Sequence, residues 1–136
     1  FAVAAPVHAV GTETTTTTEK TAYETAEKQI KSKRYKDAIK TLKQLVADEP
    51  KNADAWNLYA FASRKNGQFD NAGTFYKVAL KLNPKHLGAL EYQGELFLDI
   101  GQPDNAMQNL AAIKAICGTC SELRELARAI KKAGSS

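Results

Sequence analysis

The hydrophobic and polar pattern of residues 53–86 predicts two helices that fold back on each other. Apolar side chains recur at helical spacing over residues 54–65 and again over residues 69–82. Gly67 stands between the two runs, and glycine readily adopts the left-handed backbone with which many helices end. Pro84 follows the second run, and a proline disfavours helical backbone in the residue before it. The segment is therefore predicted to form a helical hairpin.

This pattern repeats along the chain with a period of 34 residues. Small and bulky apolar residues return in register in the units 19–52, 53–86 and 87–120. Four of these rows are Ala26, Ala60 and Gly94; Ala38, Ala72 and Ala106; Leu42, Tyr76 and Leu110; and Leu45, Ala79 and Ile113. Three hairpins and one further helix after them predict an all-α chain of about seven helices with no sheet.

An amphipathic segment, residues 121–133, follows the third unit. Leu123, Leu126, Ala127 and Ile130 are predicted to face inward, and Arg124, Arg128, Lys131 and Lys132 outward. A repeat array needs a terminal helix with a polar outer face to stay soluble. The segment is therefore predicted to be a capping helix that completes a repeat domain over residues 20–133, with residues 134–136 as a tail.

The middle unit resembles the tetratricopeptide repeat family. Its matching positions are Trp56, Tyr59, Ala60, Gly67, Phe69, Ala72, Tyr76, Ala79 and Pro84. The third unit departs from the family pattern at Pro103 and Gly118, and the first has Ala22 where the family has tryptophan. The resemblance implies a right-handed superhelix of helical hairpins, with a concave groove lined by the first helix of each unit. It also implies binding of a protein or peptide segment, without catalysis.

The resemblance further implies which side chains face the groove: Tyr23, Glu27, Asn57, Phe61, Arg64, Glu91 and Glu95. Aromatic and arginine side chains are the usual anchors of binding surfaces, and an asparagine amide can pair with a peptide backbone. For Tyr23 and Phe61 a second interpretation stays open, in which the rings pack against the neighbouring unit as core. The opposite charges of the second and third units predict an amphipathic partner segment of mixed charge.

One mode of peptide binding known in this family does not fit the sequence. Some members hold the C-terminal carboxylate of heat-shock chaperones with a clamp of lysine, asparagine and arginine. The first-unit positions of that clamp are Tyr23 and Glu27 here, and the third-unit positions are Gly88 and Tyr92. Only Asn57 lies near the clamp pattern, so a carboxylate clamp is not expected.

The segment 1–19 differs in composition from the repeats. Residues 1–9 are apolar and end at Ala9 with small residues spaced as for signal-peptide cleavage. Residues 11–19 are polar and rich in threonine, so they are predicted to be a flexible leader. The pattern predicts an exported protein, periplasmic or secreted. The alternative is a cytoplasmic scaffold in which this segment is a linker.

Cys117 and Cys120 form a Cys-x-x-Cys pair at the end of the third unit. A structural disulfide at the joint to the capping helix is favoured, because the thiols of an exported protein oxidise. The pair also allows a thiol–disulfide redox function, although that motif usually accompanies a strand–helix–strand unit. A structural zinc would need about four ligands. No metal is expected, since the chain has no third cysteine and His86 stands in a turn where it is predicted to be exposed.

Composition and charge narrow the function further. The formal net charge of +4 is unevenly spread, with +4 over residues 20–52 and −3 over residues 87–120. Nucleic-acid binding is not expected, since the basic residues do not gather with stacking aromatics. No apolar run approaches the roughly 18 residues of a membrane helix. No catalytic triad, phosphate loop or paired-carboxylate site is suggested, so neither catalysis nor a cofactor is expected. A homodimer through the terminal units is left open.

Overall fold

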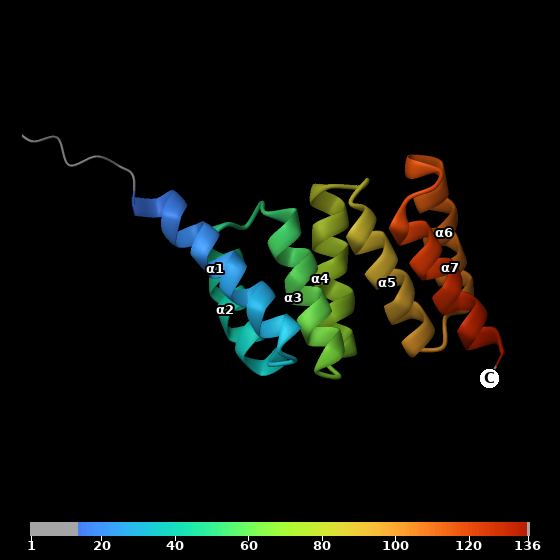
Figure 1. Cartoon of the computed structure of the whole chain (residues 1–136), viewed down its shortest axis with the longest axis horizontal. Coiled ribbons are helices and arrows are strands. Elements are labelled where there is room, and N and C mark those ends of the chain that lie inside the picture. The colour runs from blue at the N-terminus through green and yellow to red at the C-terminus, as the bar shows by residue number, and fades with distance from the viewer. Residues whose placement is uncertain (1–13, 136) are drawn as a thin grey trace, which may run out of the picture.

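The computed structural model describes residues 14–135, and their side chains from residue 21 on. Within this range the chain forms seven α-helices and no strand, as the repeat pattern predicts. In chain order the helices are α1 (Thr14–Lys31), α2 (Tyr35–Asp48), α3 (Ala53–Lys65), α4 (Phe69–Leu82), α5 (Leu87–Asp99), α6 (Pro103–Cys117) and α7 (Ser121–Gly134). Each predicted unit supplies one hairpin: α1 with α2, α3 with α4, and α5 with α6. Helix α7 follows them as the cap (Figure 1).

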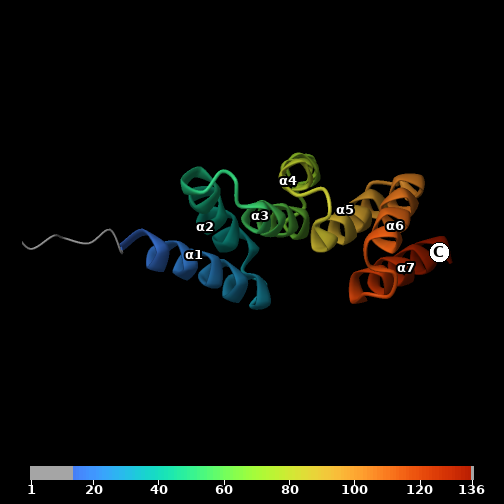
Figure 2. The ribbon, with the colours of Figure 1, turned by 90° about the horizontal axis from the view of Figure 1, so that it is seen from above.

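The helices form two layers. Figure 2 shows α1, α3, α5 and α7 in one layer and α2, α4 and α6 in the other. The first layer is curved: α3 and α5 form its middle, and α1 and α7 form its two ends, which lie lower in the view of Figure 2. The concave face therefore belongs to the first helix of each unit and to the capping helix.

The first helix of every unit is followed by a turn that contains one residue with left-handed backbone. Gly67 has a φ of 79° and Gly101 a φ of 74° at this point. The first unit has Lys33 there instead, at a φ of 57°. Glycine adopts such a backbone freely, whereas a side chain makes it less favourable. The turn geometry is thus kept in all three units, even in the unit without the glycine.

The core consists of three clusters that follow one another along the array. The first cluster lies among α1, α2 and α3, the second among α3, α4 and α5, and the third among α5, α6 and α7. Trp56 packs against both the first and the second cluster. Leu80 packs against both the second and the third. These shared side chains join the units into one continuous core.

Small residues occupy the helix crossings, as the sequence rows predict. The side chains that are 0% exposed include Ala26, Ala38, Ala60, Ala72 and Ala106. Gly94 of α5 faces Leu126 of α7, and a Cβ atom at Gly94 would lie 2.7 Å from both Leu126 methyl carbons. Packed cores tolerate little extra volume. The glycine therefore lets the capping helix approach the third unit.

Both ends differ from the sequence prediction. Helix α1 begins at Thr14, within the segment predicted to be flexible. A helix that already exists extends readily, because each added residue gains one hydrogen bond. The predicted signal-peptide remnant falls in residues 1–13, outside the described residues.

In α7, Leu126 is buried as predicted, but Ala127 is exposed, so the inward position predicted for Ala127 is wrong.

Candidate functional site

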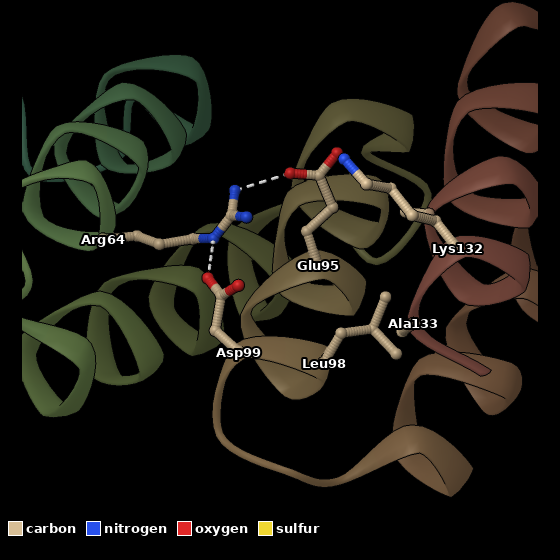
Figure 3. Close-up of a pocket in the computed structure, with 7 residues that line it drawn as sticks. Arg64, Glu95, Leu98, Asp99, Lys132 and Ala133 are labelled. Carbon is tan, nitrogen blue, oxygen red and sulfur yellow. Dashed lines mark hydrogen bonds and ion pairs between the residues drawn. The ribbon is translucent and has the colours of Figure 1, made fainter. Parts of the chain in front are cut away.

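The concave layer contains a hollow between α3, α5 and α7. Its volume is about 400 Å³. Its lining residues are Arg64 of α3, Glu95, Leu98 and Asp99 of α5, and Ala129, Lys132 and Ala133 of α7 (Figure 3). Leu98 points toward Ala133 of α7, and the charged groups lie beside this apolar contact. Apolar surface next to fixed charges is typical of a binding site.

Arg64 is held between two carboxylates of α5. Its Nη1 donates to Glu95 Oε2 and its Nε to Asp99 Oδ2, each at 2.6 Å. The Arg64 side chain is 9% exposed. Burial disfavours its charged form, but the hydrogen bond to Asp99 and the two negative charges outweigh that cost, so the pKa of Arg64 is raised. Arg64 and Glu95, predicted separately as groove residues, thus neutralise each other and join α3 to α5.

Glu91 is buried in the concave layer without a partner. It is 8% exposed and lies on α5, four residues before Glu95. Among the described residues, no hydrogen bond or ion pair reaches its carboxylate. Burial, and to a lesser degree neighbouring negative charge, raises the pKa of Glu91 to about 7. That charge belongs to Glu95 on the same helix and to Glu122 and Glu125 on α7.

Asn57 and Phe61 lie about one turn apart on α3, and both approach the third unit. Asn57 is 7% exposed, and its Oδ1 is buried without a hydrogen-bond partner. Its Nδ2 lies 3.4 Å from the position that a Cβ on Gly88 would take. The half-buried Phe61 ring lies 4.8 Å from the Tyr92 ring of α5. Phe61 thus contacts the neighbouring unit but is not among the residues of the three core clusters, so the two interpretations stay open.

Tyr23 and Glu27 occupy the first-unit end of the concave layer, on α1. Tyr23 is half-buried and packs against the first core cluster. Burial raises the pKa of its hydroxyl to about 12, and the negative charges of Asp54 and Glu27 contribute. Neither Tyr23 nor Glu27 lines the hollow. The predicted groove residues thus fall into two groups, one at α1 and one at the junction of α3, α5 and α7.

The sequence prediction misses two charged residues of this face. Lys132, predicted to point outward, lines the hollow, and Figure 3 shows its amine pointing toward Glu95. Asp99 completes the pair of carboxylates around Arg64. A signal for Asp99 exists in the sequence, since it stands four residues after Glu95 and so shares its helix face. Lys132 is exposed, as its predicted outward position implies, and it also lines the hollow because the capping helix borders the groove.

His86 caps α5 and is not an exposed turn residue as predicted. Its side chain is 12% exposed. Its Nδ1 accepts the N–H of Ala89 in the first turn of α5 at 3.1 Å. The proton of the neutral ring is therefore on Nε2, which donates to Asp54 Oδ1 at 2.8 Å. His86 thus connects the start of α5 to the start of α3.

Cys117 and Cys120 lie at the joint between α6 and α7. Their sulfur atoms are within bonding distance, and their Cα atoms are 5.7 Å apart. Both side chains pack against the third core cluster. The described part of the chain contains no group of three or more histidine, cysteine, aspartate or glutamate side chains placed to hold a metal ion. None of the helices in that part has the length and apolar character needed to cross a membrane.

Known proteins with similar sequences agree with this architecture. Residues 23–86 match the family model described as tetratricopeptide repeat. Over 94 residues, which are 69% of this chain, the sequence is 33% identical to Superkiller complex protein 3 of Mus musculus. That match covers 6% of the mouse protein, so the chain corresponds to a small part of this relative.

Solved structures share the fold over nearly the whole chain. One is the first TPR of Spaghetti (RPAP3) bound to the HSP90 peptide SRMEEVD, with a TM-score of 0.77 at 19% identity, covering 93% of this chain and 100% of that one. Another is the Yersinia enterocolitica type III secretion chaperone SycD in complex with a peptide of the translocator YopD, with a TM-score of 0.76 at 21% identity, covering 89% and 92%. With the repeat period, the two-layer array and the match to the family model, the chain belongs to the tetratricopeptide repeat family.

Proposed function

We propose that the chain is a non-catalytic interaction module that binds a segment of another protein along the concave face of α1, α3, α5 and α7. The observation that supports this most directly is the hollow of about 400 Å³ between α3, α5 and α7. Leu98, Ala129 and Ala133 give it an apolar wall that can take an aliphatic side chain. The charged groups beside this wall can fix the direction in which the segment lies.

Two structural neighbours support the same proposal. The RPAP3 domain holds an HSP90 peptide, and SycD holds a peptide of YopD. At 19% and 21% identity, these structural similarities show a shared fold and not a shared partner. The chemistry of the partner is therefore inferred from the groove of this chain.

The charges of the concave face favour a partner with apolar and basic residues. Glu91 of α5 has negative charge from Glu122 and Glu125 of α7 around it. Arg64 cannot balance these groups, because its guanidinium is already engaged with two carboxylates. An acidic C-terminal segment would meet like charge here, and like charges across an interface oppose binding. This agrees with the absence of a carboxylate clamp from the sequence.

Replacing Ala129 with tryptophan should abolish capture of the partner and leave the fold intact. Ala129 is half-buried on the wall of the hollow, so the added indole fills the space without removing a core side chain. Ala127→Trp is the matched control, because it places the same indole on an exposed position of the same helix. Quantitative pull-down with mass spectrometry compares the two variants, while circular dichroism and Tm report on the fold.

The added tryptophan is a sharper probe than truncation of Phe61. The Phe61 ring packs against Tyr92, so Phe61→Ala removes a contact between units as well as any contact with a partner. If Ala129→Trp is folded and captures the same proteins as Ala127→Trp, the concave face is not the binding surface. The convex face then becomes the better candidate.

We also propose that the protein is exported and that Cys117 and Cys120 are joined by a structural disulfide. Protein recovered from an oxidising compartment should then show no free thiol, and its mass should lie about 2 Da below that of the reduced form. A loop this short contributes only about 2 kcal/mol by the chain-entropy relation, so the bond would mainly stiffen the corner between α6 and α7.

Intact mass before and after reduction measures the state of the pair. A bond that mild thiol buffers reduce readily would favour the redox alternative, which gains no support from an all-helical array. A stoichiometric metal on freshly isolated protein would contradict the disulfide.

A further inference from the structure

The buried carboxylate of Glu91 has no group in the described structure that offsets its charge. Glu91 as a whole is 8% exposed, and no described residue donates a hydrogen bond to its carboxylate, whose oxygens are not fully enclosed. A buried charge without a partner is costly, and proteins normally pair or hydrogen-bond such a group. Asn57, which approaches α5 about one turn before Glu91, also has a buried oxygen without a donor. The concave layer thus contains two polar side chains whose oxygens have no hydrogen-bond partner among the described residues, one on α3 and one on α5.

Two other carboxylates on the same face of α5 have a cation bound between them. Glu95 lies one turn after Glu91, and Asp99 one turn after Glu95. These two carboxylates enclose the guanidinium of Arg64, which is 9% exposed and 2.6 Å from each of them. Figure 3 shows this guanidinium entering from α3 between the two acids. Glu91 thus continues a row of acids on α5 whose other members already bind an arginine.

The capping helix α7 contributes acidic residues on the side of Glu91 that faces away from α3. The negative charges that act on Glu91 from outside its own helix belong to Glu122 and Glu125 of α7. Of these two, Glu125 is paired with Arg128 at 2.8 Å, so Glu122 is the one more open to a further cation. The described residues contain no set of acids close enough to one another to hold a metal ion. The arrangement therefore suits an organic cation that reaches carboxylates on two helices. An arginine fork does this better than a lysine amine, because its planar donors can serve two carboxylates at once.

We propose that the concave face binds an arginine side chain of the partner segment, with its guanidinium between Glu91 of α5 and Glu122 of α7. Glu125 lies one turn further along α7 and already holds Arg128 of its own helix. This inference rests on the proposed function and names the residue that the partner must carry. The neighbouring hollow then takes an aliphatic side chain of the same segment. The partner segment combines an arginine with an apolar residue close to it in space.

The ionisation of Glu91 agrees with this arrangement. Burial and the charges of Glu95, Glu122 and Glu125 raise the pKa of Glu91 to about 7. On α3, the neutral Asn57 faces the start of α5, and Arg64 is engaged with other carboxylates. On α7, Arg128 is paired with Glu125. A bound guanidinium favours the ionised carboxylate and lowers this pKa. Affinity should therefore fall as the pH is lowered from 8 to 6, because Glu91 takes up a proton.

The test uses a random peptide library displayed on phage and selected on the whole chain. Peptides that bind the wild type but not Ala129→Trp are synthesised, each with a twin in which citrulline replaces one arginine. Citrulline keeps the shape of arginine and removes its charge. Affinities are measured for the wild type, for Glu91→Gln, and for Asp48→Asn, which removes one exposed charge at the end of α2 and serves as the control.

The expected result is an arginine at one fixed position of the selected peptides. Glu91→Gln and the citrulline twin should each weaken binding by about tenfold or more, as expected for a charge-assisted hydrogen bond, and together they should cost little more than either alone. Asp48→Asn should change nothing.

Two other outcomes overturn the inference and can be told apart. If peptides sensitive to Ala129→Trp lack a fixed arginine, or bind Glu91→Gln as well as the wild type, the arginine site is wrong and the proposed function stands. If no peptide is enriched, or every one binds Ala129→Trp equally well, the proposed function fails together with the inference.

Discussion

Replacing Trp56 with alanine is expected to lower the free energy of unfolding by about 3–5 kcal/mol, the usual range for removal of a large core aromatic. The indole packs against both the first and the second core cluster, so its loss opens the junction between two units. Its ring centroid lies 5.6 Å from that of Phe75 and 6.2 Å from that of Tyr59. Its Nε1 also donates to the carbonyl oxygen of Pro50 at 2.8 Å.

Urea unfolding followed by circular dichroism measures the effect of Trp56→Ala. Leu82→Ala is the control, since Leu82 is 39% exposed and its truncation should cost less than about 1 kcal/mol. A loss below about 1 kcal/mol for Trp56→Ala as well would mean that Trp56 is not a core residue. The register of the repeats would then be wrong.

Glu91→Gln is expected to stabilise the free protein above pH 7 and to leave its stability unchanged near pH 4.5. The pKa of Glu91 is raised from 4.5 to about 7 in the folded chain. The folded state therefore holds this proton more tightly than the unfolded state, and stability falls as the pH rises from about 4.5 to about 7. Glutamine keeps the shape of the side chain and has no charge to bury.

The gain above pH 7 should be about 1–3 kcal/mol, after allowance for partial screening of the charges by solvent. Thermal unfolding of the wild type and of Glu91→Gln at pH 5 and pH 8 measures it. Asp48→Asn, which alters an exposed carboxylate, should show no comparable change between the two pH values. A variant less stable than the wild type at pH 8 would show that a protein group already stabilises the Glu91 carboxylate.

The architecture could be predicted because it follows from periodic properties of the chain. Rows of small residues at one spacing predict where helices cross, and these alanines are fully buried. Glycine at the end of a helix predicts a left-handed turn, and Gly67 and Gly101 form one. The first unit has no glycine at this place, yet Lys33 forms the same left-handed turn. The register of the repeat alone therefore predicts the turn there. Such features depend on local geometry, which a sequence displays directly.

The pairing of charges in the groove could not be predicted, because periodicity gives the face of a residue and not its neighbour. Arg64 and Glu95 both face the groove, yet they are bound to each other and not offered to a partner. Nothing in the linear pattern states that two side chains on successive units lie 2.6 Å apart. The place of Lys132 at the groove could not be predicted for a related reason: the charges of a cap are expected to face solvent, and α7 also borders the groove.

The contact between a bound segment and the concave layer can be observed most directly by NMR of alanine methyl groups. A selected peptide is titrated into protein labelled at its alanine methyls. We expect the signals of Ala129 and Ala133, which line the hollow, to shift and to saturate with the binding curve. The signals of Ala127 on the outer side of α7 and of Ala111 on α6, both exposed, should stay in place. Shifts at Ala127 and Ala111 with unchanged signals at Ala129 and Ala133 would contradict binding in the concave groove.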